Sequence, residues 1–385
     1  MTRLLLLLAV GLAGCPSPSA PSDPTPEPPE TLDLPSDPGA PGVPVGITTA
    51  TFEGQTFEVW YPATDGVADA AGQSLSLDAF VPDAFIDRVG AFELTALTSD
   101  AVREAPPRRL ASSVPVLLFS HGFGGFRTQS ASLCEHLASR GYVVVAADHP
   151  GRMLGDVLPC LFDPPLDGCD LAGLAGGDDP AVDDLLAARR WVELTAGGDD
   201  HPVGALMDAG TLGIFGHSAG GGTAMELGGL DAKLSAILSM AAPASTDADK
   251  PAAILGGRCD PFADPPSLTG ALAGLSDGVW VDIEDAGHMP FADMCAAELD
   301  VLADDLLVGR PDVDAGFLES MLDLAASGCP GITPPADPPC GPAFLPLADS
   351  GQIIETYATA FFDQALSGTG EGIVGGLFDH AEVTR

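Results

Sequence analysis

Gly216-His217-Ser218-Ala219-Gly220 is the most informative segment of this chain, and it fits the pattern G-x-S-x-G. A short apolar run, Thr211-Leu212-Gly213-Ile214-Phe215, precedes it, and a segment of helical character follows from Thr223. Between a strand and a helix, this pattern predicts a nucleophile elbow, a sharp turn that exposes a serine hydroxyl. The alternative is a glycine-rich turn in a chain with 47 glycines, but the flanking strand and helix favour the elbow.

Apolar strands and helices alternate on both sides of the elbow. We expect strands over 114–120, 142–148, 211–215, 235–240, 252–256 and 279–284, and helices near 76–98, 130–140, 180–196, 267–274, 293–308 and 351–367. Strands that are apolar throughout and separated by helices predict a mostly parallel sheet with helices on both faces. Residues 45–385 are therefore predicted to form a single α/β domain of the α/β-hydrolase fold, beginning with an antiparallel hairpin over 47–61 and interrupted by an insertion over 309–349.

A serine hydroxyl becomes a good nucleophile only when a base takes its proton. In this fold the order along the chain is serine, acid, histidine, and each residue follows a strand. Of the seven histidines, His288 and His380 are the two that follow Ser218. His288 comes directly after the strand at 279–284, whereas His380 lies in a polar C-terminal tail, so we predict His288 as the general base.

The acid of the triad is predicted to be Asp260, just beyond the strand at 252–256. It would accept a hydrogen bond from Nδ1–H of His288 and so hold the imidazole in the active tautomer. Asp264 is a nearby alternative, and two more distant ones follow the preceding strand. These are Asp247 and Asp249.

An oxyanion hole needs two N–H donors aimed at the charge that develops on the substrate oxygen. Ala219, directly after the nucleophile, is predicted to supply one. The loop His121-Gly122-Phe123-Gly124-Gly125 follows the strand at 114–120 and is predicted to supply the other. We assign it to the Phe123 N–H, with Gly122 and Gly124 as alternatives, and expect His121 to brace the loop.

The N-terminus has the features of a targeting segment. After Arg3 comes an apolar run of about ten residues, shorter than the roughly 20 that a membrane-spanning helix needs. Leu12-Ala13-Gly14-Cys15 resembles a bacterial lipobox, which implies removal of the signal peptide 1–14 and lipidation of Cys15; an ordinary secretory signal is the alternative. Because Pro16 and not Asp follows, we expect an outer-membrane lipoprotein. Residues 15–44 are rich in proline and acidic residues and are predicted to be a disordered tether.

Export allows disulfide bonds, and the remaining cysteines fall into plausible pairs. The expected pairs are Cys160–Cys169, Cys329–Cys340 and Cys259–Cys295. The first two would each close a local loop, and the third would tie the acid loop to the histidine loop. The alternative for the third is two unrelated cysteines. Cys134 falls in a predicted helix and is expected to be buried and unpaired.

The formal net charge of −40 argues against nucleic-acid binding, because phosphate contacts need cations. Paired acids such as Asp178-Asp179, Asp183-Asp184 and Asp199-Asp200 could hold Ca²⁺, but none has EF-hand spacing. We therefore expect no metal and no cofactor. The expected partners are an ester substrate and the membrane that holds the lipid anchor, and we expect a monomer.

Three segments of the chain carry a resemblance to a known family. They are Leu118-Phe119-Ser120-His121-Gly122-Phe123-Gly124-Gly125-Phe126-Arg127-Thr128, Gly216-His217-Ser218-Ala219-Gly220-Gly221 and Gly287-His288-Met289-Pro290-Phe291-Ala292-Asp293. They resemble the platelet-activating-factor acetylhydrolases, and the resemblance spans most of 45–367. It extends to cutinase-like polyester hydrolases and dienelactone-hydrolase-like proteins. It implies a serine carboxylic-ester hydrolase.

One departure from the acetylhydrolases concerns the acid. In that family the acid follows the strand right after the elbow, but here that strand ends Met240-Ala241-Ala242-Pro243, without a carboxylate. The cutinase-like pattern, with the acid one strand later, suits Asp260. Those enzymes also carry a disulfide linking the acid and histidine loops.

Together these features predict a lipid-anchored, exported serine esterase. Ser218 would attack a short-acyl ester, His288 would move the proton, and Asp260 would orient His288. Acetylated phospholipids, small lipids and polyester ends are the expected substrates. The alternatives are acyl transfer to an acceptor other than water and a non-catalytic surface-binding protein on a hydrolase scaffold.

Overall fold

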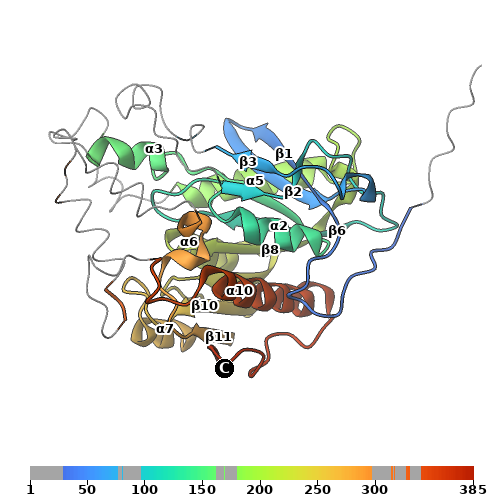
Figure 1. The fold of residues 1–385 in the computed structure, drawn as a ribbon. Helices are drawn as coiled ribbons and strands as arrows, with labels where there is room; N and C mark the ends of the chain where they lie inside the picture. Colours follow the sequence, from blue (N-terminus) through green and yellow to red (C-terminus); the bar gives the residue numbers. More distant parts are fainter. Residues whose placement is uncertain are drawn as a thin grey trace, which may run out of the picture.

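The structure is a computed structural model that describes residues 29–76, 80, 97–161, 169, 180–296, 314, 316, 327–329 and 340–385. Its strands are β1 (Val45–Phe52), β2 (Gln55–Pro62), β3 (Gln73–Leu75), β4 (Leu97–Ser99), β5 (Val102–Arg103), β6 (Val114–Ser120), β7 (Val143–Ala147), β8 (Met207–His217), β9 (Leu234–Met240), β10 (Pro251–Gly257), β11 (Asp277–Ile283) and β12 (Ala381–Thr384). Within these residues, ten strands form one sheet in the order β12-β11-β10-β9-β8-β6-β7-β2-β1-β5. Figure 1 shows the fold and labels several of these strands. A separate two-stranded sheet pairs β3 with β4.

The centre of the large sheet is parallel, from β7 through β6, β8, β9 and β10 to β11. Every residue of β7 is buried, as expected of a strand covered on both faces. The predicted hairpin is present, because β1 and β2 pair antiparallel beside β7. The structure therefore has the predicted α/β architecture, with its parallel strands ending at one common edge.

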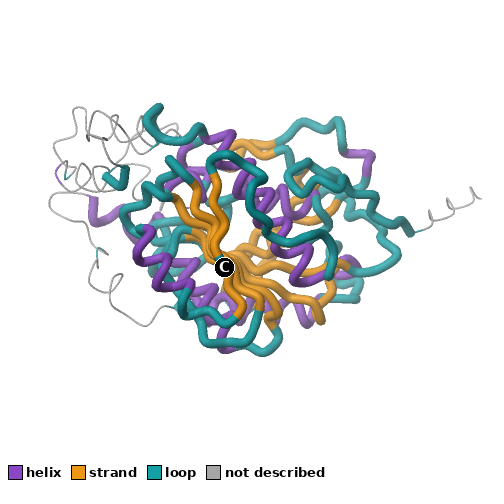
Figure 2. The backbone as a smooth tube through the Cα atoms, turned by 90° about the horizontal axis from the view of Figure 1, so that it is seen from below, coloured by secondary structure: helices purple, strands orange, loops and turns teal. Residues whose placement is uncertain are grey.

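Helices cover both faces of this sheet, and Figure 2 shows them on either side of the strands. They are α2 (Ala131–Ser139), α3 (Leu154–Val157), α5 (Ala181–Thr195), α6 (Ala219–Leu230), α7 (Pro265–Leu272) and α10 (Leu347–Phe362), with short turns η1 (Asp65–Val67), η3 (Leu158–Leu161), η4 (Gly204–Leu206), η5 (Met289–Phe291), η6 (Asp293–Cys295) and η7 (Asp363–Ser367). One core cluster packs α2 and α10 against the sheet, for example through Leu137 and Tyr357. The other packs α5, α6 and α7 through residues such as Trp191, Met225 and Leu268.

The C-terminal end of the sheet differs from the sequence prediction. The polar C-terminal tail contains β12, which pairs antiparallel with β11 and extends the sheet at that edge. Its four residues, Ala381–Thr384, alternate apolar and polar, but this is the shortest run in which such alternation indicates a strand. Most of the helix predicted near 76–98 lies outside the described residues, and its last two positions are wrong, because they belong to strand β4. Most of the helix predicted at 293–308 and most of the insertion at 309–349 also lie outside the described residues.

Residues 29–44 are packed on the domain, unlike the disordered tether predicted over 15–44. Arg140, after the end of α2, donates hydrogen bonds to the carbonyls of Pro35 and Ala40. Val43 N–H donates to the carbonyl of Ser139. This segment therefore needs no core of its own, because the end of α2 binds its backbone.

The signal peptide 1–14 and residues 15–28 lie outside the described residues. In the described ranges, no helix has the length and apolar character that crossing a bilayer requires.

Candidate active site

The elbow forms the turn between β8 and α6. Ser218 has φ 57° and ψ −123°, a left-handed conformation that is strained for a residue with a side chain. The glycines on either side permit this turn, since a Cβ on Gly220 would meet the carbonyl of Ser120 and one on Gly216 would meet that of Gly220. The hydroxyl of Ser218 is thereby held at the edge where the parallel strands end.

Three side chains from different loops meet at this edge. His288 Nε2 lies 2.9 Å from Ser218 Oγ, and its Nδ1 lies 2.8 Å from Asp260 Oδ2. Asp260 is 1% exposed, and its other oxygen accepts the N–H groups of Phe262 and Ala263 at 2.8 and 3.1 Å. Because a carboxylate only accepts, Nδ1 carries the proton and Nε2 is free to take the proton of Ser218. This is the geometry of a serine nucleophile with an oriented base.

The alternative residues lie elsewhere. Asp264 is exposed and caps α7 by accepting the Ser267 N–H. Asp247 and Asp249 are exposed in the loop after β9. His380 is exposed, and its carbonyl accepts the Glu284 N–H beside β11. The structure thus brings together the three residues that chain order singled out and leaves the others outside the site.

The loop after β6 runs beside Ser218, since a Cβ on Gly122 would lie 3.2 Å from the Ser218 Cβ. Gly122 N–H donates to Gln129 Oε1, and Gly124 N–H donates to the Arg152 carbonyl. These bonds occupy the two amides that were alternatives for the second oxyanion donor. The N–H of Phe123 donates to no group within the described part of the chain.

Ala219 is the first residue of α6, so its N–H has no intrahelical acceptor and sits at the positive end of the helix dipole. Phe123 and Ala219 therefore remain the donors available on the two segments that flank the nucleophile.

One supporting contact was not visible in the sequence. His217 is 4% exposed, and burial holds its pKa well below the usual value, so its ring is neutral. Its Nδ1 accepts from Gln129 Nε2 at 2.8 Å, and its Nε2–H donates to the His288 carbonyl at 3.1 Å. Since Gln129 also binds Gly122, one chain of hydrogen bonds joins the oxyanion loop to the backbone of His288. Gln129 belongs to no pattern that would have marked it.

The disulfides correct two predicted pairs. Cys160–Cys169 is present, and Cys134 is buried and free, as predicted. The predicted pairs Cys259–Cys295 and Cys329–Cys340 are wrong. The two bonds that form instead join cysteines 70 and 45 positions apart in the sequence. The observed bonds are Cys259–Cys329 and Cys295–Cys340. Short spacing misled the prediction of Cys329–Cys340, and proximity to the candidate acid and base misled that of Cys259–Cys295. The chain instead brings residue 329 to the acid loop and residue 340 to the histidine loop. Each catalytic loop is thus fastened to the insertion, not to the other loop.

Apolar side chains flank the site. The Phe262 ring lies 4.8 Å from the His288 ring, and Phe262 and Phe123 are 40% and 43% exposed. Cys259, Cys329 and Asp285 place ligand-type atoms within 4.8 Å of one another, but the two sulfurs are joined in a disulfide and are not metal-binding thiolates. The site therefore offers a nucleophile, a base and apolar walls.

Known proteins are similar to this chain in its fold and in the segment that contains the oxyanion loop. Residues 49–153 match the family model described as platelet-activating factor acetylhydrolase, isoform II. A stretch of 35 residues is 49% identical to platelet-activating factor acetylhydrolase from Gallus gallus, and it spans 9% of this chain and 8% of that relative. Ferulic acid esterase from Streptomyces cinnamoneus has a similar structure, with a TM-score of 0.56 and 24% identity over 90% of this chain and 97% of that one. The chain therefore shares the fold of an esterase, and its residues 49–153 are similar to part of the acetylhydrolase family.

Proposed function

We propose that this protein is a serine esterase that hydrolyses short-acyl carboxylic esters. The observation that carries the proposal is the contact series from Ser218 Oγ through the His288 ring to buried Asp260. In a hydrolase fold with a strained elbow, this arrangement suits acyl transfer to serine and then to water.

The residues act in a fixed order in this proposal. Ser218 Oγ forms a bond to the ester carbonyl carbon while its proton moves to His288 Nε2. The N–H groups of Phe123 and Ala219 stabilise the negative oxygen of the tetrahedral intermediate. His288 gives the proton to the leaving alkoxide as the carbon–oxygen bond breaks, which leaves an acyl-serine. Water then adds to the acyl carbon and gives a proton to His288 Nε2. The bond to Ser218 Oγ breaks, Oγ takes that proton from His288, and the carboxylic acid leaves.

The substrate class is proposed on two grounds. The matched family model and the similar solved structure carry the names of an acetylhydrolase and a ferulic acid esterase. The exposed rings of Phe123 and Phe262 beside the triad favour an uncharged acyl or alcohol group over a charged one. Acetylated phospholipids, small lipids and polyester ends meet these conditions.

Hydrolysis of p-nitrophenyl acetate tests the proposal. Wild-type protein should release nitrophenol, and Ser218→Ala should fall to the background rate. Equal rates for the two proteins would show that Ser218 is not the nucleophile. A series of acyl lengths then measures the preferred chain, which we expect to be short.

A further inference from the structure

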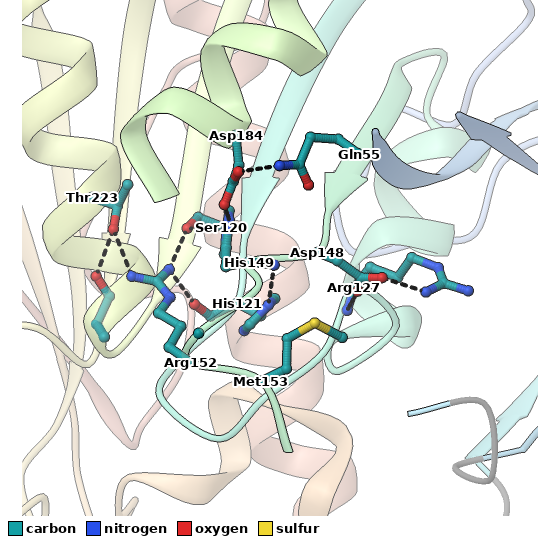
Figure 3. Close-up of polar contacts among 12 residues, drawn as sticks. Gln55, Ser120, His121, Arg127, Asp148, His149, Arg152, Met153, Asp184 and Thr223 are labelled. Atoms are coloured by element: carbon teal, nitrogen blue, oxygen red, sulfur yellow. Dashed lines mark hydrogen bonds and ion pairs between the residues drawn. The ribbon is translucent and has the colours of Figure 1, made fainter. Parts of the chain in front are cut away.

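A second polar cluster lies buried beneath the oxyanion loop (Figure 3). We call it the Arg152 cluster, and it consists of Ser120, His149, Arg152, Asp184 and Thr223. Ser120 and His149 have no exposed surface, and Arg152, Asp184 and Thr223 are at most 5% exposed. Removing the charged guanidinium of Arg152 from water costs free energy, so its burial here needs a physical reason.

Within the cluster, three residues repeat the contacts of a catalytic triad. Ser120 Oγ lies 2.9 Å from His149 Nε2, and His149 Nδ1 lies 3.1 Å from Asp184 Oδ2. Ser120 Oγ also accepts an N–H from Arg152 at 2.9 Å. Because Ser120 is sealed from solvent and its oxygen is already bound by a cation, no ester can reach it. This set is therefore not a second nucleophile.

The hydrogen bonds from Arg152 to Asp184 all have the same donor-to-acceptor direction. Arg152 can only donate, so it donates to Ser120 Oγ, and the Ser120 hydroxyl donates to His149 Nε2 (Figure 3). The His149 Nδ1–H then donates to Asp184. Burial, together with the nearby charge of Arg152, holds the pKa of His149 well below its usual value and keeps the ring neutral. The positive guanidinium is thus linked to the negative Asp184 through two neutral groups.

Arg152 binds the oxyanion loop on both sides of Phe123. Its Nη2–H donates to the His121 carbonyl at 2.8 Å, and its own carbonyl accepts the Gly124 N–H at 2.8 Å. His121 is also buried and neutral, since burial lowers its pKa to about 3. The 121–122 and 123–124 peptide units, on either side of the one that carries the Phe123 N–H, are therefore both held by one residue.

The same guanidinium reaches the helix that follows the nucleophile. Arg152 Nη1–H donates to Thr223 Oγ1 at 3.1 Å, and the Thr223 hydroxyl donates to the Ala219 carbonyl at 3.1 Å. Ala219 and Phe123 are the two residues whose N–H groups flank the nucleophile. Arg152 thus contacts both segments that supply oxyanion donors.

We propose that Arg152 is a positioning residue that sets the spacing of the Phe123 and Ala219 N–H groups, and that Ser120, His149 and Asp184 hold its guanidinium in place. This inference rests on the proposed ester hydrolysis. Donors must lie about 2.7–3.1 Å from the oxyanion to be effective, and a glycine-rich loop does not hold that geometry alone. Arg152 acts through these donors and does not touch the substrate.

The test compares kcat, KM and the affinity for a boronic acid, whose serine adduct is tetrahedral and uses the oxyanion hole. Arg152→Met should lower kcat for p-nitrophenyl acetate by about 10²-fold, the loss caused by removing one oxyanion donor, with KM changed by less than about threefold. Boronate affinity should fall with kcat, because both need the same donors. Thr223→Val should lower both in the same direction by a smaller factor.

Arg140→Met is the matched control, because Arg140 is also 5% exposed and binds carbonyls of the segment 29–44, away from the triad. It should lower the melting temperature and leave kcat and boronate affinity unchanged. The proposal is overturned if Arg152→Met keeps wild-type kcat and boronate affinity, or loses no more than the control does. If Arg152→Met does not fold, Thr223→Val decides, and wild-type values for it overturn the proposal. Failure of the esterase assignment can be distinguished from failure of this proposal, because wild type and Ser218→Ala would then be equally inactive.

Discussion

Replacing Asp260 by asparagine probes the part of the site that orients the base. The new side chain has the same shape, and its oxygen would still accept the N–H groups of Phe262 and Ala263. The amide nitrogen then faces His288 Nδ1 in place of the carboxylate oxygen now 2.8 Å away. Because an amide nitrogen donates, Nδ1 must accept, and the proton moves to Nε2. The base then presents a hydrogen to Ser218 and cannot take its proton.

The size of the loss follows from this change of tautomer. The same replacement in a serine protease triad lowers kcat by about 10⁴-fold, which corresponds to about 5.5 kcal/mol of transition-state stabilisation. We expect a loss of this order for Asp260→Asn. KM should change little, because Asp260 is 1% exposed and does not contact the substrate.

The assay is steady-state hydrolysis of p-nitrophenyl acetate, with thermal unfolding measured alongside. Asp264→Asn is the matched control, since this exposed residue only caps α7 and asparagine is an equally good cap. It should keep wild-type kcat. The reasoning fails if Asp260→Asn retains more than about a tenth of kcat, or if Asp264→Asn or Asp247→Asn loses as much as Asp260→Asn.

Three further predictions concern other parts of the molecule. Gln129→Leu removes the acceptor of the Gly122 N–H and the donor to His217, and it should lower kcat by about tenfold without unfolding the protein. Burial raises the pKa of Glu355 from 4.5 to about 7, so the folded chain keeps a proton that the unfolded chain releases and stability falls between those pH values. Glu355→Gln should therefore raise the urea midpoint at about pH 8 and leave it unchanged at about pH 4; an equal shift at both would refute this. We also propose the lipid anchor, so Cys15→Ser should move the protein from the membrane to the soluble fraction, and retention on the membrane would contradict it.

The sequence predicted those parts of the site that depend on chain order. Ser218, Asp260 and His288 each follow a strand of a parallel sheet, and such strands end at one edge, so order along the chain was enough to bring them together. The central strands were predicted because continuous apolar runs bounded by loops favour buried parallel strands. The N-terminal strand pair was predicted from the alternation of apolar residues over 47–61.

Contacts that depend on the path of a loop could not be predicted. Cys259 binds Cys329, and not the cysteine of the other catalytic loop, because of where the insertion runs. Gln129 and Arg152 support the oxyanion loop through side-chain geometry that no sequence pattern encodes. The packing of residues 29–44 likewise could not be predicted. Arg140 binds backbone carbonyls of this segment, and every residue has a backbone carbonyl.

Within the described residues, Ser218 and Ser120 each contact a histidine that in turn contacts an aspartate, and one measurement distinguishes the two sets. A fluorophosphonate reacts with a serine only where a base activates it and solvent reaches it. After labelling and digestion, mass spectrometry should place the adduct on Ser218, and Ser218→Ala should carry none. Ser120, sealed and bound by Arg152, should remain unlabelled. An adduct on Ser120, or equal labelling of wild type and Ser218→Ala, would contradict the central claim that Ser218 is the nucleophile.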